Sequence, residues 1–188
     1  RAVGLPGREI ATLLNLKLGW PMFDREILQA MAGDDECRRQ IYETMDEREL
    51  SWLESFLKGM RTSAEGREDY FHRLTETVLA LARKGHTIIL GRAADLILPR
   101  GIGLRVRITA SREHCVKSYA ELKGIPIDKA TKAVEEVEHE RARFVRHHFQ
   151  IEVNDPSRND LIFNMERFTV QQVADVILAA LRTKGIIS

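Results

Sequence analysis

Cysteine is scarce in this chain: the 188 residues include two, Cys37 and Cys115. Neither has a second cysteine at the short spacing that zinc sites use, and no H-x-x-x-H pair occurs. The sequence therefore predicts no metal-ligating residues. Isolated cysteines are typical of a reducing compartment, so we expect free thiols and a cytoplasmic location.

Long apolar runs and charge of one sign are also missing. No apolar run approaches the roughly 18 residues that a membrane span needs, and no signal peptide is visible. Lys and Arg number 29 against 28 Asp and Glu, a net charge of +1. Aromatic residues make up 6% and do not alternate with basic ones, which disfavours nucleic-acid binding. No Ser/His/Asp order and no internal repeat are found.

What remains is the composition of an ordinary globular protein, with 44% hydrophobic and 30% charged residues. The length predicts one domain spanning residues 1–188. Apolar periodicity predicts helices at residues 8–18, 25–32, 68–83, 127–149 and 169–184, with helical pieces in 34–69. Strands are expected at 86–90, 104–109 and 161–163, after a short apolar stretch at 20–23. Strands separated by helices predict an α/β fold with a parallel sheet covered on both faces.

A glycine-punctuated turn precedes the first predicted helix, with the sequence Gly4-Leu5-Pro6-Gly7-Arg8-Glu9. Such a turn can aim backbone N–H groups and a helix N-terminus at a phosphate. It departs from the G-x-x-x-x-G-K-[ST] pattern, and taken alone it is better explained as a Gly-Pro turn that simply begins a helix. If the turn does bind phosphate, a strand must lead into it, and we expect residues upstream of Arg1.

Arginines stand at two further places where an anion could bind. Arg92 follows Gly91 directly after a predicted strand, and it is either a surface arginine or a bidentate phosphate ligand. Arg141 interrupts the apolar face of the helix at 127–149, so it needs an anionic partner, which is either Glu138 or a substrate phosphate. Arg143 and Arg146 face elsewhere and suit a solvated surface.

Two aspartates lie beside predicted strands. Asp24 follows the apolar stretch at 20–23, and Asp160 precedes the strand at 161–163. Each is either a cap for a helix or turn, or a ligand for substrate hydroxyl groups.

Taken in order, four segments resemble the cytidylate kinase-like family, relatives of the bacterial P-loop nucleoside monophosphate kinases. Residues 4–11 resemble that family's G-S-G-G-R-E-I turn, which also has Arg-Glu in place of Lys-Ser. The similarity continues in the segments 18–26 and 89–98, and in 141–149 together with 155–157 and 160–164. Three positions depart from the family pattern: Leu5-Pro6 replaces Ser-Gly, and Ala93 replaces the aspartate that helps cytidylate kinases to read cytosine.

The resemblance implies a three-layer α/β/α fold with a helical monophosphate-binding insertion near 34–84 and a lid near 125–158. It implies transfer of the γ-phosphoryl group of ATP to CMP or dCMP, with Mg²⁺. The implied ATP-phosphate ligands are Gly4, Pro6, Gly7, Arg8 and Glu9, and the implied catalytic arginines are Arg8, Arg141, Arg143 and Arg146. Arg92 would hold the acceptor phosphate, with Asp24 and Asp160 as further substrate ligands.

An alternative stays open beside the kinase. Pro6 and Glu9 also suit a catalytically weak or inactive module that binds a nucleotide or another anion within a longer regulatory protein. In either case the expected partners are small-molecule nucleotides, neither nucleic acid nor a membrane. The sequence is compatible with a homo-oligomer and does not specify one.

Overall fold

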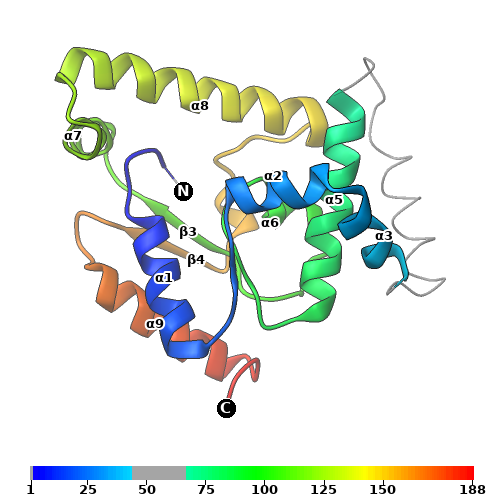
Figure 1. Ribbon diagram of the computed structural model, residues 1–188. Coiled ribbons are helices and arrows are strands. Elements are labelled where there is room, and N and C mark those ends of the chain that lie inside the picture. The colour runs from blue at the N-terminus through cyan, green and yellow to red at the C-terminus, as the bar shows by residue number, and fades with distance from the viewer. Residues whose placement is uncertain (1, 44–66) are drawn as a thin grey trace. The chain divides into compact units, whose positions relative to one another are not determined.

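The computed structural model describes residues 2–43 and 67–188. Its chain divides into two compact units (Figure 1). Unit 1 comprises Arg1–Gly19 and Gly103–Ser188, and unit 2 comprises Trp20–Ile102.

Unit 1 contains four α-helices, one 3-10 helix and two strands among its described residues. In chain order they are α1 (Gly7–Leu18), β3 (Val106–Thr109), α7 (Arg112–Lys123), α8 (Ile127–Phe149), η1 (Pro156–Arg158), β4 (Leu161–Asn164) and α9 (Val170–Thr183). Strands β3 and β4 are parallel, with Val106 opposite Leu161 and Thr109 opposite Asn164. The Ala2 amide donates a hydrogen bond of 3.2 Å to the Ile108 carbonyl, so the residues before the Gly4 turn run beside β3.

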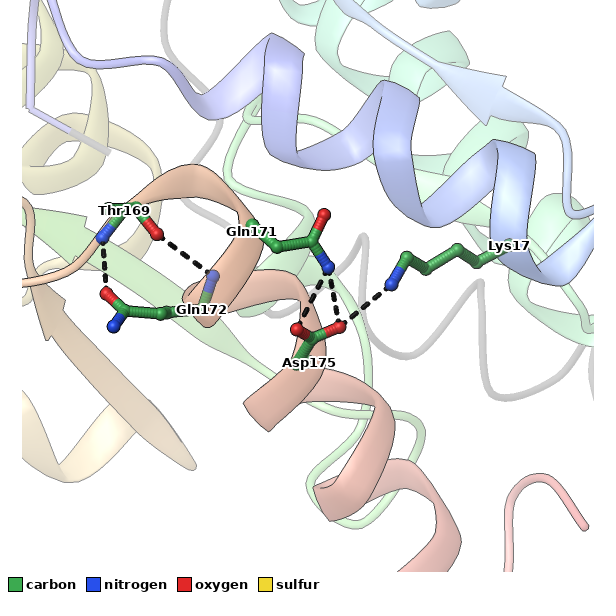
Figure 2. A network of polar contacts seen from close by, with 5 residues as sticks. All are labelled: Lys17, Thr169, Gln171, Gln172 and Asp175. Atoms are coloured by element: carbon green, nitrogen blue, oxygen red, sulfur yellow. Dashed lines mark hydrogen bonds and ion pairs between the residues drawn. The ribbon is translucent and has the colours of Figure 1, made fainter.

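Helix α1 packs against α9 in unit 1 (Figure 1). Figure 2 shows an exposed ion pair between the two helices, in which Lys17 Nζ lies 2.8 Å from Asp175 Oδ1. It also shows the capping box that starts α9, where the Thr169 hydroxyl accepts from the Gln172 amide and the Gln172 side chain accepts from the Thr169 amide. Local sequence thus fixes where α9 begins, and apolar residues of both helices are buried.

Helices α7 and α8 form the second packed pair of unit 1. Ser111 caps α7 by accepting from the His114 amide, and Gly124 ends it in the left-handed conformation. The buried cluster beside these helices consists of Val3, Val116, Ala120, Ala130 and Val134. Val3 belongs to the chain's first residues, so this core holds the segment that leads into the Gly4 turn.

Unit 2 is mostly helical in its described part. Its elements are β1 (Met22–Phe23), α2 (Arg25–Gly33), α3 (Asp35–Glu43), α5 (Arg67–Lys84), β2 (Ile88–Ile89) and α6 (Ala94–Ile97). Strands β1 and β2 are parallel, with Met22 opposite Ile88. Helix α5 contacts α2, α3 and α6. Its residues Leu74 and Val78 are fully buried, as are Leu28 of α2 and Ile97 of α6.

The structure confirms the predicted helices in both units. The helix predicted at 127–149 is α8 with the same bounds. The predictions at 8–18 and 25–32 differ from α1 and α2 by one residue at one end, and those at 68–83 and 169–184 differ from α5 and α9 by one residue at each end. Strands β2 and β3 are shorter than predicted, because only part of each apolar run is paired, whereas β4 extends one residue beyond its prediction. The predicted parallel pairing is confirmed as two small sheets of two strands each in a mixed, mostly helical α/β structure.

The apolar face expected at Trp52, Leu53, Phe56 and Leu57 and the loop expected at 61–67 fall on or overlap residues outside those described. Within the described ranges, no helix has the length and apolar character that crossing a membrane requires.

Candidate functional site

The turn after β2 has an unusual backbone. Gly91, Arg92 and Ala93 have φ angles of +75°, +56° and +54°, so three successive residues adopt the left-handed conformation. Glycine adopts this conformation readily, whereas arginine and alanine each lose about 1 kcal/mol or more in it. Leu90 is still tied to β1, because its amide donates 2.9 Å to the Phe23 carbonyl. Backbone strain of this kind, directly after a strand, is typical of functional sites.

The side chain of Arg92 presents one edge of its guanidinium group without a partner. Atoms Nε and Nη2 are both buried, and neither has a hydrogen-bond partner among the described residues. These two nitrogens form the side of the planar guanidinium that donates two parallel hydrogen bonds to a phosphate or a carboxylate. A buried guanidinium edge with no acceptor is costly, so this geometry suits a bound anion.

Two other side chains contribute to the environment of Arg92. The pKa of Arg92 is lowered from its usual value, mainly by burial; Tyr70 opposes this shift and Arg25 adds to it. Tyr70 lies in the first turns of α5, and Arg25 is the first residue of α2. The hydroxyl of Tyr70 is itself buried without a hydrogen-bond partner among the described residues. The strained turn, α2 and α5 therefore gather two cations and one hydroxyl.

Asp24 has a local structural role. Its carboxylate accepts from the backbone amides of Glu26 at 3.1 Å and Ile27 at 3.2 Å, which caps the N-terminus of α2. The cap fixes the start of α2 and therefore the position of Arg25. Of the two interpretations left open by the sequence, the structure shows the cap, and a role in substrate binding stays a prediction.

The turn at the start of unit 1 is closely packed. Gly4 has a φ of +79°, and a Cβ atom built there would lie 2.6 Å from the Cys115 carbonyl oxygen. Pro6 has no amide hydrogen, and the Gly7 amide donates 2.8 Å to the Leu5 carbonyl inside the turn. Two N–H groups that a phosphate turn would offer are thus absent or already used.

The remaining predicted residues of unit 1 lie on α1, on α8 and before β4. Arg8 and Glu9 are exposed in the first turn of α1. Arg141 is half-buried on α8, where Val134 and Val145 are buried on the predicted apolar stripe. Arg143 is exposed, and Arg146 Nη2 lies 3.1 Å from Glu152 Oε1 in an exposed ion pair.

Asp160 ties the start of β4 to its surroundings. It accepts from the Arg105 amide at 2.6 Å and from Lys184 Nζ at 3.1 Å. The Arg105 amide contributes most to lowering the pKa of Asp160, and Lys184 adds to it. The carboxylate therefore has two structural contacts, and a role in substrate binding stays a prediction.

Unit 1 also contains a cavity of about 400 Å³. None of the predicted site residues lines it; its walls include Arg107, Arg112 and Glu138. Arg107 donates to the Val153 carbonyl at 2.8 Å, and Arg112 pairs with Glu135. These two arginines therefore form contacts that stabilise the structure of unit 1.

The predicted site residues are divided between the units. The Gly4–Glu9 turn, the three arginines of α8 and Asp160 belong to unit 1, whereas Arg92 and Asp24 belong to unit 2. Tyr70 and Arg25 were not predicted from the sequence. Tyr70 lies one helical turn before Leu74 on the predicted apolar side of α5, so a polar-tipped residue on a buried stripe was the available signal.

Comparisons with known proteins agree with this description. A crystal structure of an uncharacterized protein from Eubacterium ventriosum is similar, with a TM-score of 0.74 and 19% identity over 97% of this chain and 95% of that one. This likeness shows a shared fold. No curated protein matches the chain. The model of the cytidylate kinase-like family matches residues 1–167, which contain both turns and the arginines of α8. The chain belongs to the cytidylate kinase-like family.

Proposed function

We propose that this protein is a nucleoside monophosphate kinase that transfers the γ-phosphoryl group of ATP to CMP or dCMP. The observation that carries the proposal is the unpartnered edge of Arg92 on its strained turn, in a chain of the cytidylate kinase-like family. The edge suits two oxygens of an acceptor phosphate. The three-layer P-loop arrangement, with its insertion near 34–84 and its lid near 125–158, is part of the same proposal.

The arginines would act by position and charge. Phosphoryl transfer needs little covalent chemistry from a protein, because alignment and neutralisation of charge lower the barrier most. Arg92 would fix the acceptor phosphate, while Arg141, Arg143 and Arg146 of α8 would stabilise the charge on the transferred group. Of these, Arg143 is exposed, and Arg146 would leave the exposed pair with Glu152 at little cost.

The donor side fits the phosphates of ATP in part. Gly4 and Gly7 shape the turn, and Arg8 and Glu9 stand exposed at the N-terminus of α1, where helix dipoles favour an anion. Mg²⁺, when bound with the nucleotide, would neutralise phosphate charge. Glu9 is the carboxylate of this turn that could hold the ion through water, as Mg²⁺ sites often do.

A second candidate is a module of the same family that binds a nucleotide or another anion without catalysis. The missing amide of Pro6 and the internally bonded amide of Gly7 favour it. These features leave fewer amide donors to bind a donor phosphate, and they do not affect the acceptor site at Arg92.

Release of ADP from ATP, measured by a coupled assay with each nucleoside monophosphate and deoxynucleoside monophosphate, tests the proposal. The kinase predicts turnover that depends on the acceptor and is highest with CMP or dCMP. A flat response across all acceptors contradicts it. Calorimetric binding of ATP without turnover would select the second candidate.

A further inference from the structure

Tyr70 places a hydroxyl group beside Arg92 that nothing in the described structure satisfies. It lies on α5, which packs against α2 and α6, and Arg92 immediately precedes the residue that caps α6. The packing of α5 against α6 brings Tyr70 toward the Arg92 turn, and Tyr70 opposes the lowering of the Arg92 pKa, as a neighbouring phenol does. A buried hydroxyl usually finds a partner, because leaving it without one sacrifices the hydrogen bond that water would give.

Tyr70 and Arg92 together present three buried polar atoms that have no hydrogen-bond partner among the described residues. They are Tyr70 Oη, Arg92 Nε and Arg92 Nη2. The two nitrogens point the same way by the geometry of the guanidinium group and take two oxygens of one ligand. The hydroxyl adds a third donor. Arg25 contributes positive charge, since its side chain is close enough to affect Arg92.

We propose that Tyr70 donates a hydrogen bond to a third oxygen of the phosphate held by Arg92, which makes the site selective for phosphate monoesters over carboxylates. A carboxylate has two oxygens, both of which the Arg92 edge engages, so it offers no third oxygen to Tyr70. A phosphate monoester has three terminal oxygens and carries close to two charges at neutral pH, which suits three donors and two cations. This proposal rests on the proposed function in one respect: Arg92 holds the acceptor phosphate.

The experiment compares the full chain with its Tyr70→Phe variant, which removes one oxygen atom. Inorganic phosphate, acetate and CMP are titrated separately, and the Arg92 Nε–H resonance is followed by NMR. We expect phosphate and CMP to bind roughly 10-fold more weakly to the variant, as for a lost hydrogen bond to a charged group. The affinity for acetate should stay unchanged, and wild-type protein should prefer phosphate to acetate.

Thr77→Val is the matched control, because it also removes a buried hydroxyl from α5. The Thr77 hydroxyl donates 2.8 Å to the Arg73 carbonyl within the helix, so its loss should leave the phosphate affinity unchanged. Combining Tyr70→Phe with Arg92→Lys tests whether the two side chains share one ligand, in which case their effects on phosphate affinity are not additive.

The outcomes separate this proposal from the proposed function. Equal phosphate affinity in wild type and Tyr70→Phe overturns the role of Tyr70, even if the protein phosphorylates CMP. Phosphate binding that weakens in Tyr70→Phe, in a protein that turns over no monophosphate, supports Tyr70 and refutes the kinase. Wild-type protein that binds acetate as well as phosphate overturns the selectivity directly, without any variant.

Discussion

The Gly4–Glu9 turn of unit 1 and the Gly91–Ala93 turn of unit 2 contain similar residues. They differ in how closely the glycine is packed and in whether their hydrogen-bond donors are available to a ligand. Both combine glycine with an arginine and lead into a helix. In the first, Gly4 is packed against the α7 backbone and the Gly7 amide is bonded within the turn. In the second, the space around the Gly91 Cβ position is open and an arginine edge lacks a partner.

This difference indicates that Gly4 and Gly91 have different structural roles. At Gly4 the absence of a side chain allows close packing, so the residue is needed for the fold whether or not a phosphate binds. At Gly91 it allows a backbone conformation that aims Arg92. A glycine-rich turn therefore indicates a phosphate site only when its donors remain available, and by that criterion the Arg92 turn is the stronger site.

The largest effect should come from Gly4→Ala. The new Cβ would clash with the Cys115 carbonyl, and alanine is strained at a φ of +79°. Overpacking and strain together should lower the free energy of unfolding by about 2–5 kcal/mol. Urea denaturation of wild type and variant measures the loss.

Gly91→Ala is the matched control for this substitution. Nothing lies within 4 Å of its Cβ position, so only the strain at a φ of +75° applies, about 1–2 kcal/mol. Equal losses of unfolding free energy in Gly4→Ala and Gly91→Ala would contradict the closer packing of the Gly4 turn.

The next largest effect is expected for Arg92→Lys, which keeps the positive charge but removes the two parallel hydrogen-bond donors of the guanidinium group. The value of kcat/KM for the acceptor should fall about 10- to 100-fold, as expected for lost hydrogen bonds to a charged group. Arg100→Lys, at an exposed arginine of the same unit, should leave the kinetics unchanged. Steady-state kinetics with varied CMP would show either result, and an Arg92→Lys enzyme with wild-type kinetics contradicts the acceptor assignment.

Ala93→Gly should have a smaller effect, of opposite sign. The left-handed backbone at Ala93 is unfavourable for alanine, and glycine removes most of that strain at some entropic cost. We expect a gain of about 0.5–1 kcal/mol in the free energy of unfolding, measured by urea denaturation. A loss of stability would show that the Ala93 methyl group packs usefully and that the turn is less strained than its angles imply.

A pH effect on unit 1 completes the series. Burial, with a further effect of His147, lowers the pKa of His148 to about 4. Because the folded state binds the proton less tightly than the unfolded state does, stability should fall as pH drops from about 6.5 toward 4. After allowance for solvent screening the loss is on the order of 1 kcal/mol. The free energy of unfolding of His148→Gln, measured by denaturation at several pH values, should depend less on pH across this window than that of the wild type. An unchanged pH dependence contradicts the lowered pKa of His148.

Local signals made the helices predictable from the sequence. Gly19 ends α1, and the apolar stripe of α8 defines its full length. The strands were less predictable, because a short apolar run does not reveal how much of it will pair. Family resemblance, confirmed over residues 1–167, supplied the order of the site segments.

A site residue was predictable only where a side chain able to bind phosphate stands at a position that the sequence itself marks, such as the end of a strand. Arg92 follows a strand, and that position identified it. The amide geometry of Pro6 and Gly7 depends on a hydrogen bond inside the turn, which no pattern of residue types specifies. Tyr70 comes near Arg92 through the packing of α5 against α6, so its relevance required tertiary structure.

The pairing of α1 with α9 has a consequence for how the molecule forms during synthesis. Lys17 and Asp175 are 158 residues apart along the chain, and α9 is therefore made long after α1, against which it packs. Contacts between such distant segments form slowly because a large loop must close first. Helix α1 will thus emerge from the ribosome well before α9, whereas the elements around Arg92 can pack while translation continues.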